Sequence, residues 1–336
     1  MKITIFALGN ATKASSRVRA YWIAEEWIKL NHRVSVLWKI SPLQFWKLLR
    51  ELWNSDVFVF QKTYGRSHLI LAKIIRALNK PYFVDIDDFP SRNHNEITLS
   101  NFQTLCIQSN GVFAGSETLK NWISSFQSKV YLIPSGIKES LYILEVKSDN
   151  KQKTCLGWIG NGAHYQADLI EILLPIAAHF SGNPNIEFRF IGVDETSLFA
   201  EKMRDISPLN SVFIQPADWS DTTSIVKEIN KIDIGLYPLI ENDFNKYKCG
   251  FKALEYFALK LPVVSSNVAM NREIIDNGIN GYIVNNTHEW IEKLTLLIDQ
   301  KNTRMQFGLE GFNMISETYN TSKIAKDLMI IFNGNQ

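Results

Sequence analysis

The order of its segments limits how this chain can fold more than any other feature. Short apolar runs alternate with helical patterns of about 10–15 residues, as in strand-helix-strand crossover units. The first series of apolar runs covers residues 3–8, 34–38, 57–60, 82–86, 112–114 and 130–133. Helical patterns lie between them, at residues 16–30, 42–53, 66–78, 97–108 and 117–126. This alternation predicts a parallel sheet with helices on its faces.

A polar stretch at residues 134–153 interrupts the alternation, and a second series then begins. Its apolar runs cover residues 155–159, 186–191, 212–214, 234–237, 262–265 and 281–284, and three helical patterns end the chain. A length of 336 residues is also typical of two domains. We therefore expect an α/β protein with two parallel-sheet domains, residues 1–137 and 153–318, joined by a linker at 138–152 and separated by a cleft.

The composition indicates a soluble globular chain. Hydrophobic residues make up 46% and charged residues 21%, as in ordinary folded domains. The three cysteines show no metal-ligand spacing and fit a reducing compartment. The apolar start is too short for a signal peptide, and no run of 18 apolar residues occurs. The sequence therefore predicts neither a leader nor a membrane span.

Charge is unevenly distributed along the chain. Residues 1–80 contain 14 Lys and Arg but only 4 Asp and Glu, whereas the whole chain has a net charge of +2. This excess suggests that one face of the N-terminal half meets something anionic. A nucleic acid explains this basic excess less well than a lipid surface, because no recognition helix or RNA-binding signature accompanies the charge.

Residues 247–264, YKCGFKALEYFALKLPVV, read as a loop, a helix and a buried strand. Gly250 at the start of the helix leaves backbone N–H groups for an anion, and the helix dipole adds about half a positive charge there. Lys248 and Lys252 flank this junction, and Glu255 lies one turn further along the same face as Lys252. The pattern suits a phosphorylated sugar, with phosphates at the helix start and hydroxyls on the carboxylate. An ordinary surface helix with two solvated lysines is the alternative.

From residue 248 to residue 284 the sequence resembles the donor-site region of retaining GT-B glycosyltransferases of family 4, also called group 1. The similar segments are LEYFA at 254–258, PVV at 262–264, EII at 273–275 and NG at 280–281. Weaker similarity covers the whole chain, at SSRVR (15–19), GSETL (115–119), IPSGI (133–137), GWIG (157–160) and YPL (237–239). The resemblance implies the GT-B fold, with two Rossmann-like domains facing a central cleft and a C-terminal helix, residues 319–336, that crosses back toward the N-terminal domain.

The resemblance also implies roles for residues of the helical stretch. Glu255 would bind the ribose hydroxyls of a nucleotide-sugar donor. The N–H groups of Gly250 and Phe251 would meet its diphosphate. Lys252, with Lys248, would neutralise the phosphates and stabilise the leaving group, which is an electrostatic task.

Gly9 and Gly160 begin the first loops of the two domains, and the resemblance places both close to the donor, where the absence of a side chain allows close approach. Two features of the family pattern are missing. Many members have two glutamates separated by seven residues, and the first would fall at Tyr247. The loop after Gly160 lacks the Arg and Lys that many members carry there. Phosphate neutralisation would therefore also involve Arg17 or Arg19.

Asp85, Asp87 and Asp88 end the fourth strand pattern. Their spacing is similar to the DxD motif of GT-A glycosyltransferases, whose carboxylates hold a divalent cation against a diphosphate. We favour a polar role, in which Asp85 and Asp87 position an acceptor hydroxyl with help from His94. Turn formation and helix capping are the remaining alternative. We predict no metal site.

The helical pattern at residues 42–53 combines Trp46 and Trp53 with basic residues. Ser41 and Pro42 are typical of an N-cap and a first helical position. The aromatic stripe would either pack on the sheet or lie on an anionic lipid surface. The basic excess of the N-terminal half supports the lipid surface.

We therefore expect a retaining, metal-independent glycosyltransferase without a cofactor. It would move a sugar from a nucleotide-sugar to a hydroxyl of a lipid-linked glycan, in cell-surface polysaccharide or glycolipid synthesis. It would be cytoplasmic and would reach the inner face of the plasma membrane through residues 42–53. A nucleotide-sugar epimerase of the same fold and a non-catalytic sugar-nucleotide-binding protein are the two alternatives.

Overall fold

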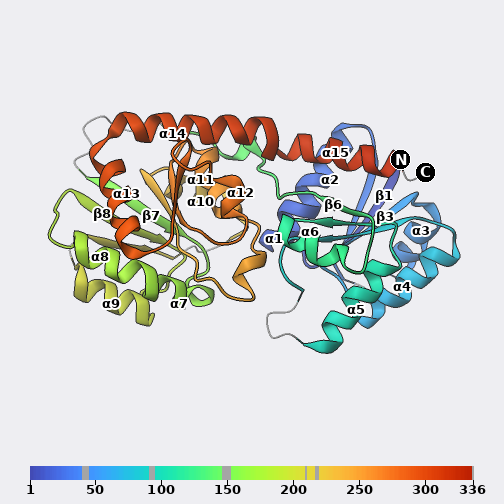
Figure 1. Ribbon diagram of the computed structural model, residues 1–336. Helices are drawn as coiled ribbons and strands as arrows, with labels where there is room; N and C mark the ends of the chain where they lie inside the picture. The colour runs from blue at the N-terminus through green and yellow to red at the C-terminus, as the bar shows by residue number, and fades with distance from the viewer. Residues whose placement is uncertain (40–44, 91–94, 146–152, 209, 216–218, 335–336) are drawn as a thin grey trace. The chain divides into compact units, whose positions relative to one another are not determined.

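A computed structural model describes residues 1–39, 45–90, 95–145, 153–208, 210–215 and 219–334 (Figure 1). The chain forms two compact units. The first contains Met1–Lys138, Tyr247–Cys249 and Thr318–Gln336, and the second contains Glu139–Lys246 and Gly250–Glu317. Ser41, Pro42, His94 and the linker residues 146–152 lie outside the described residues.

The first unit is built on a parallel sheet, whose six described strands have the order β2-β1-β3-β4-β5-β6. The strands are β1 (Lys2–Ala7), β2 (Arg33–Leu37), β3 (Val57–Gln61), β4 (Tyr82–Ile86), β5 (Gly111–Ala114) and β6 (Val130–Leu132). All residues of β3 and β4 are buried. Continuous apolar runs such as VFVF produce this result, because helices cover both faces of a parallel sheet.

The helices of the first unit follow their strands, as the alternation predicted. They are α1 (Ala14–Ser16), a π-helical turn (Arg17–Tyr21), α2 (Trp22–Lys29), α3 (Phe45–Asn54), α4 (Arg66–Ala77), α5 (Glu96–Ile107) and α6 (Glu117–Ser124). Asn95 and Ser116 begin α5 and α6 with capping hydrogen bonds to Thr98 N–H and Leu119 N–H. Residues 16–30 form a short helix, a π-helical turn and a second helix instead of the continuous helix that we predicted.

The last helix, α15 (Thr321–Gly334), belongs to the core of the first unit. It lies beside α2 (Figure 1). The indole Nε1 of Trp27 donates a hydrogen bond to the carbonyl of Ala325 at 2.9 Å, and the ring of Phe332 packs 5.5 Å from the Trp27 ring. The side chain of Phe332 also contacts the aromatic residues of β4 and β5, Phe83 and Phe113. Helix α15 therefore packs in the same core as the strands and helices formed by the N-terminal part of the chain.

The second unit contains another parallel sheet, whose six described strands have the order β12-β11-β10-β7-β8-β9. They are β7 (Thr154–Ile159), β8 (Ile186–Ile191), β9 (Ser211–Ile214), β10 (Ile234–Tyr237), β11 (Val263–Ser266) and β12 (Gly281–Val284). The chain starts in the middle of the sheet at β7, extends to β9 and then returns to the other side of β7 with β10. The topological switch point therefore lies between β7 and β10, where sheets of this kind bind ligands at their carboxyl edge.

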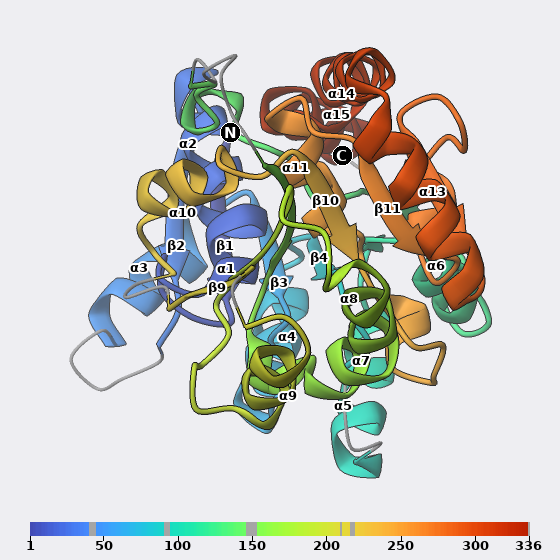
Figure 2. The same cartoon turned by 90° about the vertical axis from the view of Figure 1, so that its left-hand side faces the viewer.

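Helices follow these strands in the chain, and Figure 2 shows β10 and β11 together with α11, the helix that joins them in sequence. The helices are α7 (Gln166–Asp168), a π-helical turn (Leu169–Leu173), α8 (Leu174–Phe180), α9 (Leu198–Ile206), α10 (Thr222–Ile229), α11 (Phe251–Ala258), α12 (Asn271–Ile274), α13 (Thr287–Asp299), α14 (Lys301–Met314) and a π-helical turn (Ile315–Tyr319). Short 3-10 turns lie at Glu139–Leu141, Gly162–His164 and Asn245–Tyr247. We did not predict α12. The predicted parallel sheets of both units are confirmed, and each has the topology of a Rossmann-like domain.

No helix in the described part of the chain is both long enough and apolar enough to cross a bilayer.

Candidate functional site

Helix α11 lies directly after the loop that leaves the carboxyl end of β10, and Tyr256 holds it at the switch point. The Tyr256 hydroxyl accepts a hydrogen bond from the N–H of Ile159 at 3.1 Å. It also lies 3.2 Å from the carbonyl of Gly157 on β7 and 3.3 Å from that of Leu236 on β10. Because one buried side chain contacts both central strands, the start of α11 has a defined position at the carboxyl edge of the sheet.

The N-terminus of α11 carries no capping side chain. Its N-cap is Gly250, in the left-handed conformation with φ of 66°. A Cβ atom there would lie 2.4 Å from Cδ1 of Ile274, so both the backbone conformation and the space favour glycine. The first N–H groups of the helix are therefore available for an anion, and the helix dipole favours a negative charge at the same place.

Lys252 lies in the first turn of α11 and is 8% exposed. Its ammonium nitrogen is 3.6 Å from the ring centroid of Tyr165, 5.1 Å from that of Tyr237 and 5.5 Å from that of Trp158. Aromatic faces attract a cation and partly replace the water that burial removes. The three rings, which we call the aromatic cage, hold the positive charge near the end of the helix dipole, where a phosphate would benefit from both.

Gly160 follows β7 and contacts the same lysine. A Cβ atom on Gly160 would lie 2.8 Å from Cε of Lys252 and 2.8 Å from the ring of Trp158. The two residues were predicted from separate parts of the sequence, and the fold brings them together in the second unit. A side chain at position 160 would displace the lysine from the aromatic cage.

Asp168 stabilises the loop that leads from β10 toward α11. Its Oδ1 accepts hydrogen bonds from the N–H of Ile240 at 2.8 Å and from the side-chain amide of Asn245 at 2.9 Å. Burial raises the pKa of Asp168 above its ordinary value, while these hydrogen bonds and the charge of Lys252 lower it. The hydrogen bonds of Asp168 therefore stabilise the loop that leads to α11.

Glu255 is half-buried on α11, one turn after Lys252. Its Oε1 accepts a hydrogen bond from the hydroxyl of Tyr142 at 3.0 Å. Phe251, which we also predicted at the donor, is half-buried in the first turn of the same helix. Gly160, Gly250, Phe251, Lys252 and Glu255 thus form one group in the second unit.

The remaining predicted residues lie in the first unit. Asp85, at the end of β4, is buried in a bidentate ion pair with Arg19, in which Nε donates to Oδ1 at 2.8 Å and Nη2 donates to Oδ2 at 2.7 Å. Nη1 of Arg19 also donates to the carbonyl of Ile133 and to Ser135. Both oxygens of Asp85 therefore serve to join three segments, and this geometry favours a positioning role over direct contact with a substrate.

Asp87 and Asp88 face lysines. The ammonium group of Lys62 lies 2.7 Å from Oδ1 of Asp87 and 3.1 Å from Oδ2 of Asp88. Lys248 lies 3.9 Å from Oδ1 of Asp88, and Ser15 donates a hydrogen bond to Oδ2 of Asp87 at 2.9 Å. The predicted donor residue Lys248 is therefore placed with the acidic motif of the first unit.

Gly9 and Arg17 occupy the loop and helix start that follow β1. The N–H of Gly9 donates to the hydroxyl of Ser16 at 3.0 Å. Arg17 donates to the carbonyls of Ala11 and Thr12 at 3.4 and 3.3 Å, so its guanidinium stabilises this loop.

Several residues of these sites were not singled out from the sequence. Trp158 and Tyr237 belong to the segments at the ends of β7 and β10 that resemble the family, GWIG and YPL. Their positions in these segments could have identified them as candidate site residues. Tyr165, Asp168 and Tyr142 gave no such signal, because each acts on a residue that is distant in the sequence.

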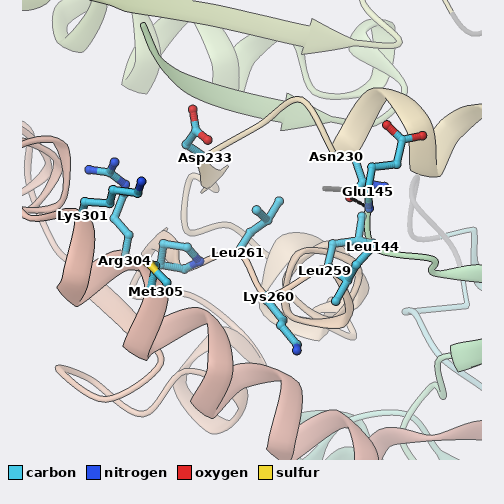
Figure 3. A pocket seen from close by; sticks show the side chains of 11 residues that line it. Leu144, Glu145, Asn230, Asp233, Leu259, Lys260, Leu261, Lys301, Arg304 and Met305 are labelled. Atoms are coloured by element: carbon cyan, nitrogen blue, oxygen red, sulfur yellow. Dashed lines mark hydrogen bonds between the residues drawn. The ribbon is translucent and has the colours of Figure 1, made fainter. Parts of the chain in front are cut away.

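A pocket of about 310 Å³ lies at the opposite, amino-terminal edge of the second sheet (Figure 3). Asp233 and Pro262, which immediately precede β10 and β11, are in its wall, together with Leu261 of the preceding turn. Arg304 and Met305 of α14 line one side. Its exposed lining is mainly apolar. Neither its position nor its chemistry suits a nucleotide-sugar, since parallel sheets bind ligands at the carboxyl edge.

The structure thus combines two Rossmann-like units with a helix at the switch point of the second unit whose N-terminus has no side-chain cap. The sequence profile of the family described as Glycosyl transferases group 1 matches residues 153–300, which include α11 and both of its neighbouring strands. The chain thus resembles group 1 glycosyltransferases, and the match supports a glycosyltransferase. No curated protein sequence matches the chain.

Solved structures with the same fold cover nearly the whole chain. HepE of Anabaena in complex with UDP is 12% identical, with a TM-score of 0.73 over 99% of this chain and 100% of that one. Sucrose-phosphate synthase of Thermosynechococcus elongatus is 11% identical, with a TM-score of 0.71 over 99% and 98% of the two chains. A putative UDP-N-acetylglucosamine 2-epimerase of Listeria monocytogenes is 9% identical, with a TM-score of 0.64 over 98% and 94%. These similarities confirm the GT-B fold class.

Proposed function

We propose that this protein transfers a sugar from a nucleoside diphosphate sugar to a hydroxyl acceptor. The observation that carries the proposal is the arrangement at α11, where Lys252 lies beside an uncapped helix N-terminus and Glu255 follows one turn later. This arrangement lies within the segment that matches the group 1 glycosyltransferases. HepE has been solved in complex with UDP and with UDP-glucose, which supports a nucleotide-sugar as the donor here.

The proposed chemistry follows from the charges at the helix. The N–H groups of Phe251 and Lys252 receive the diphosphate, and the Lys252 ammonium neutralises it. When the bond between the sugar and the diphosphate breaks, negative charge grows on the leaving phosphate oxygen. A preorganised cation at that place stabilises the transition state more than the ground state. Glu255 accepts hydrogen bonds from the ribose hydroxyls and fixes the orientation of the donor.

For the acceptor we propose Asp87 as the polar contact and Asp85 as a residue that positions the end of β4 through Arg19. Gly9, Arg17 and Lys248 complete the polar loops of the first unit. Retention of configuration and independence of metal are proposed from the family resemblance. The acceptor class that we propose is a lipid-linked glycan of cell-surface polysaccharide or glycolipid synthesis.

The decisive experiment is a screen of nucleotide-sugars by thermal shift, followed by a transfer assay with the donor that binds. A donor at 100 times its Kd stabilises the protein by about 2.7 kcal/mol, so we expect a clear rise in Tm for one nucleotide. Transfer to an added glycan acceptor should follow with the same donor. If no nucleotide-sugar changes the Tm, the assignment of a donor site at α11 is wrong.

An epimerase is the second candidate, because the Listeria protein with the same fold is described as a putative nucleotide-sugar epimerase. It predicts a different product in the same assay. Isomerisation of the donor sugar without an acceptor would support the epimerase and contradict the transferase. Binding of the donor without either reaction would leave a non-catalytic sugar-nucleotide-binding protein.

We also propose that α3 contacts an anionic lipid surface. Leu48 and Leu52 are buried, whereas Trp46 and Trp53 on the other side of the helix are 77% and 75% exposed. Phe45 and Leu49 are exposed as well, and Lys47 and Arg50 are on the same helix. Two exposed tryptophans next to basic side chains are typical of interfacial helices. Packing within the unit therefore accounts for the buried leucines but not for the two exposed tryptophans.

Replacing Trp46 and Trp53 by Glu is expected to weaken binding to vesicles that contain anionic phosphatidylglycerol by at least about ten-fold. Each indole would lose a large apolar contact and each carboxylate would be repelled by the lipid charge. Co-sedimentation with vesicles measures the effect. Ile97→Glu is the matched control, because Ile97 is 61% exposed on α5. Equal binding of the double variant and the wild type would discard α3 as the contact.

A further inference from the structure

Tyr142 lies in a short segment that the second unit holds firmly. A 3-10 turn, Glu139–Leu141, precedes it, and its N–H donates to the carbonyl of Glu139 at 2.9 Å. Its side chain is only 5% exposed, whereas the next residue, Ile143, is 68% exposed. We predicted that this segment is part of a linker. In the structure, Tyr142 has a buried side chain and belongs to the second unit.

Asn230, at the end of α10, fixes the residues that follow. Its side-chain amide donates to the carbonyl of Ile143 at 3.0 Å, and its Oδ1 accepts from the N–H of Glu145 at 3.3 Å. Figure 3 shows the hydrogen bond between Asn230 and Glu145. Because Asn230 is itself 4% exposed, the two hydrogen bonds are partly shielded from water. The backbone around Tyr142 is therefore held from both sides.

The Tyr142 hydroxyl donates a hydrogen bond to Oε1 of Glu255 at 3.0 Å. A glutamate side chain has several rotamers and loses entropy when one of them is selected. A hydrogen bond from a fixed phenol selects the rotamer before a ligand arrives. An ionised carboxylate only accepts hydrogen bonds, and it accepts about four, so the carboxylate that accepts from Tyr142 is also of the right kind to accept from the hydroxyls of a ribose.

We propose that Tyr142 is a positioning residue that orients Glu255 for the ribose of the nucleotide donor. This inference rests on the proposed function, in which Glu255 contacts that ribose. Tyr142 acts through Glu255 and does not touch the donor. It therefore increases the preference for a ribose over a sugar that lacks the 2′ and 3′ hydroxyls, because only the hydroxylated sugar uses the oriented carboxylate.

The test uses Tyr142→Phe, which removes the hydroxyl and keeps the ring. Affinities are measured by calorimetry for the nucleoside diphosphate selected in the screen and for its 2′,3′-dideoxy analogue. We expect Tyr142→Phe to weaken binding of the ribonucleotide about five- to ten-fold, as for the loss of one ordinary intramolecular hydrogen bond, and to leave binding of the dideoxy analogue unchanged. Tyr282→Phe, on β12 of the same unit, is the matched control and should change neither affinity.

Glu255→Gln separates the two proposals. If this variant still prefers the ribonucleotide as strongly as the wild type, Glu255 does not contact the ribose and the proposed donor site fails. If it loses the preference but Tyr142→Phe keeps it, only the role of Tyr142 is overturned. An equal loss for both nucleotides in Tyr142→Phe would show a merely structural role and would also overturn the proposal. In the double variant we expect no loss beyond that of Glu255→Gln, because the two residues act as one unit.

Discussion

Lys252→Ala is expected to lower kcat for sugar transfer by about 100- to 1000-fold. Removal of a single group that stabilises developing negative charge in a buried site has an effect of this size in other enzymes. The ammonium of Lys252 is held by the aromatic cage of Trp158, Tyr165 and Tyr237 at the start of α11, so no neighbouring lysine of this helix can replace it. Steady-state kinetics with saturating donor and acceptor measure the loss.

Two variants control this result. Lys260→Ala removes an exposed lysine that follows α11 and should leave kcat within about two-fold of the wild type. Lys252→Met keeps most of the volume and the packing on the rings without the charge, and it should be as inactive as Lys252→Ala. If Lys252→Met transfers sugar at the wild-type rate, the lysine does not stabilise the leaving group.

Asp85→Ala is expected to lower the free energy of unfolding by about 3–5 kcal/mol, because it leaves the buried guanidinium of Arg19 without its charge partner. The side chains of this pair are only 3% and 5% exposed, and their two hydrogen bonds join helical and strand segments of the first unit. The Tm of the first unit should fall by roughly 10 °C. Calorimetry and urea unfolding measure the change.

The matched control is the exposed ion pair between Glu117 and Lys120 on α6, with side chains 40% and 35% exposed. Glu117→Ala should cost at most about 1 kcal/mol, because water and salt screen an exposed pair. The double variant Arg19→Met/Asp85→Leu should recover much of the stability, since it removes both buried charges. An Asp85→Ala protein with wild-type Tm but no transfer activity would contradict the positioning role and favour direct contact with the acceptor.

Most of the fold could be predicted because the relevant signals are local. Alternating apolar runs and helical patterns indicate crossover units, and a chain with two such series forms two parallel sheets. The failures are local as well. The π-helical turns at Arg17–Tyr21 and Leu169–Leu173 change the hydrogen-bond register without changing the apolar pattern, so periodicity does not reveal them.

Part of the candidate site could also be predicted from the spacing of its residues in the sequence. Gly250, Lys252 and Glu255 lie within six residues, and helical geometry alone places the last two on one face. The partners of the acidic motif at the end of β4 could not be predicted from the sequence. Its spacing indicated carboxylates at the edge of the sheet, but it did not reveal that Arg19 takes both oxygens of Asp85 or that Lys62 lies between Asp87 and Asp88.

By itself the sequence determined the two-sheet architecture, the glycine at the start of α11, and the charge and carboxylate on its first turns, because each depends on residues close together in the chain. Only the tertiary structure decided what surrounds those groups. The aromatic cage joins residues 158, 165 and 237 to Lys252, and Tyr142 reaches Glu255 across more than 100 residues. Such contacts follow from the order of strands in the sheet, which places the ends of β7 and β10 together, and no local pattern encodes that neighbourhood.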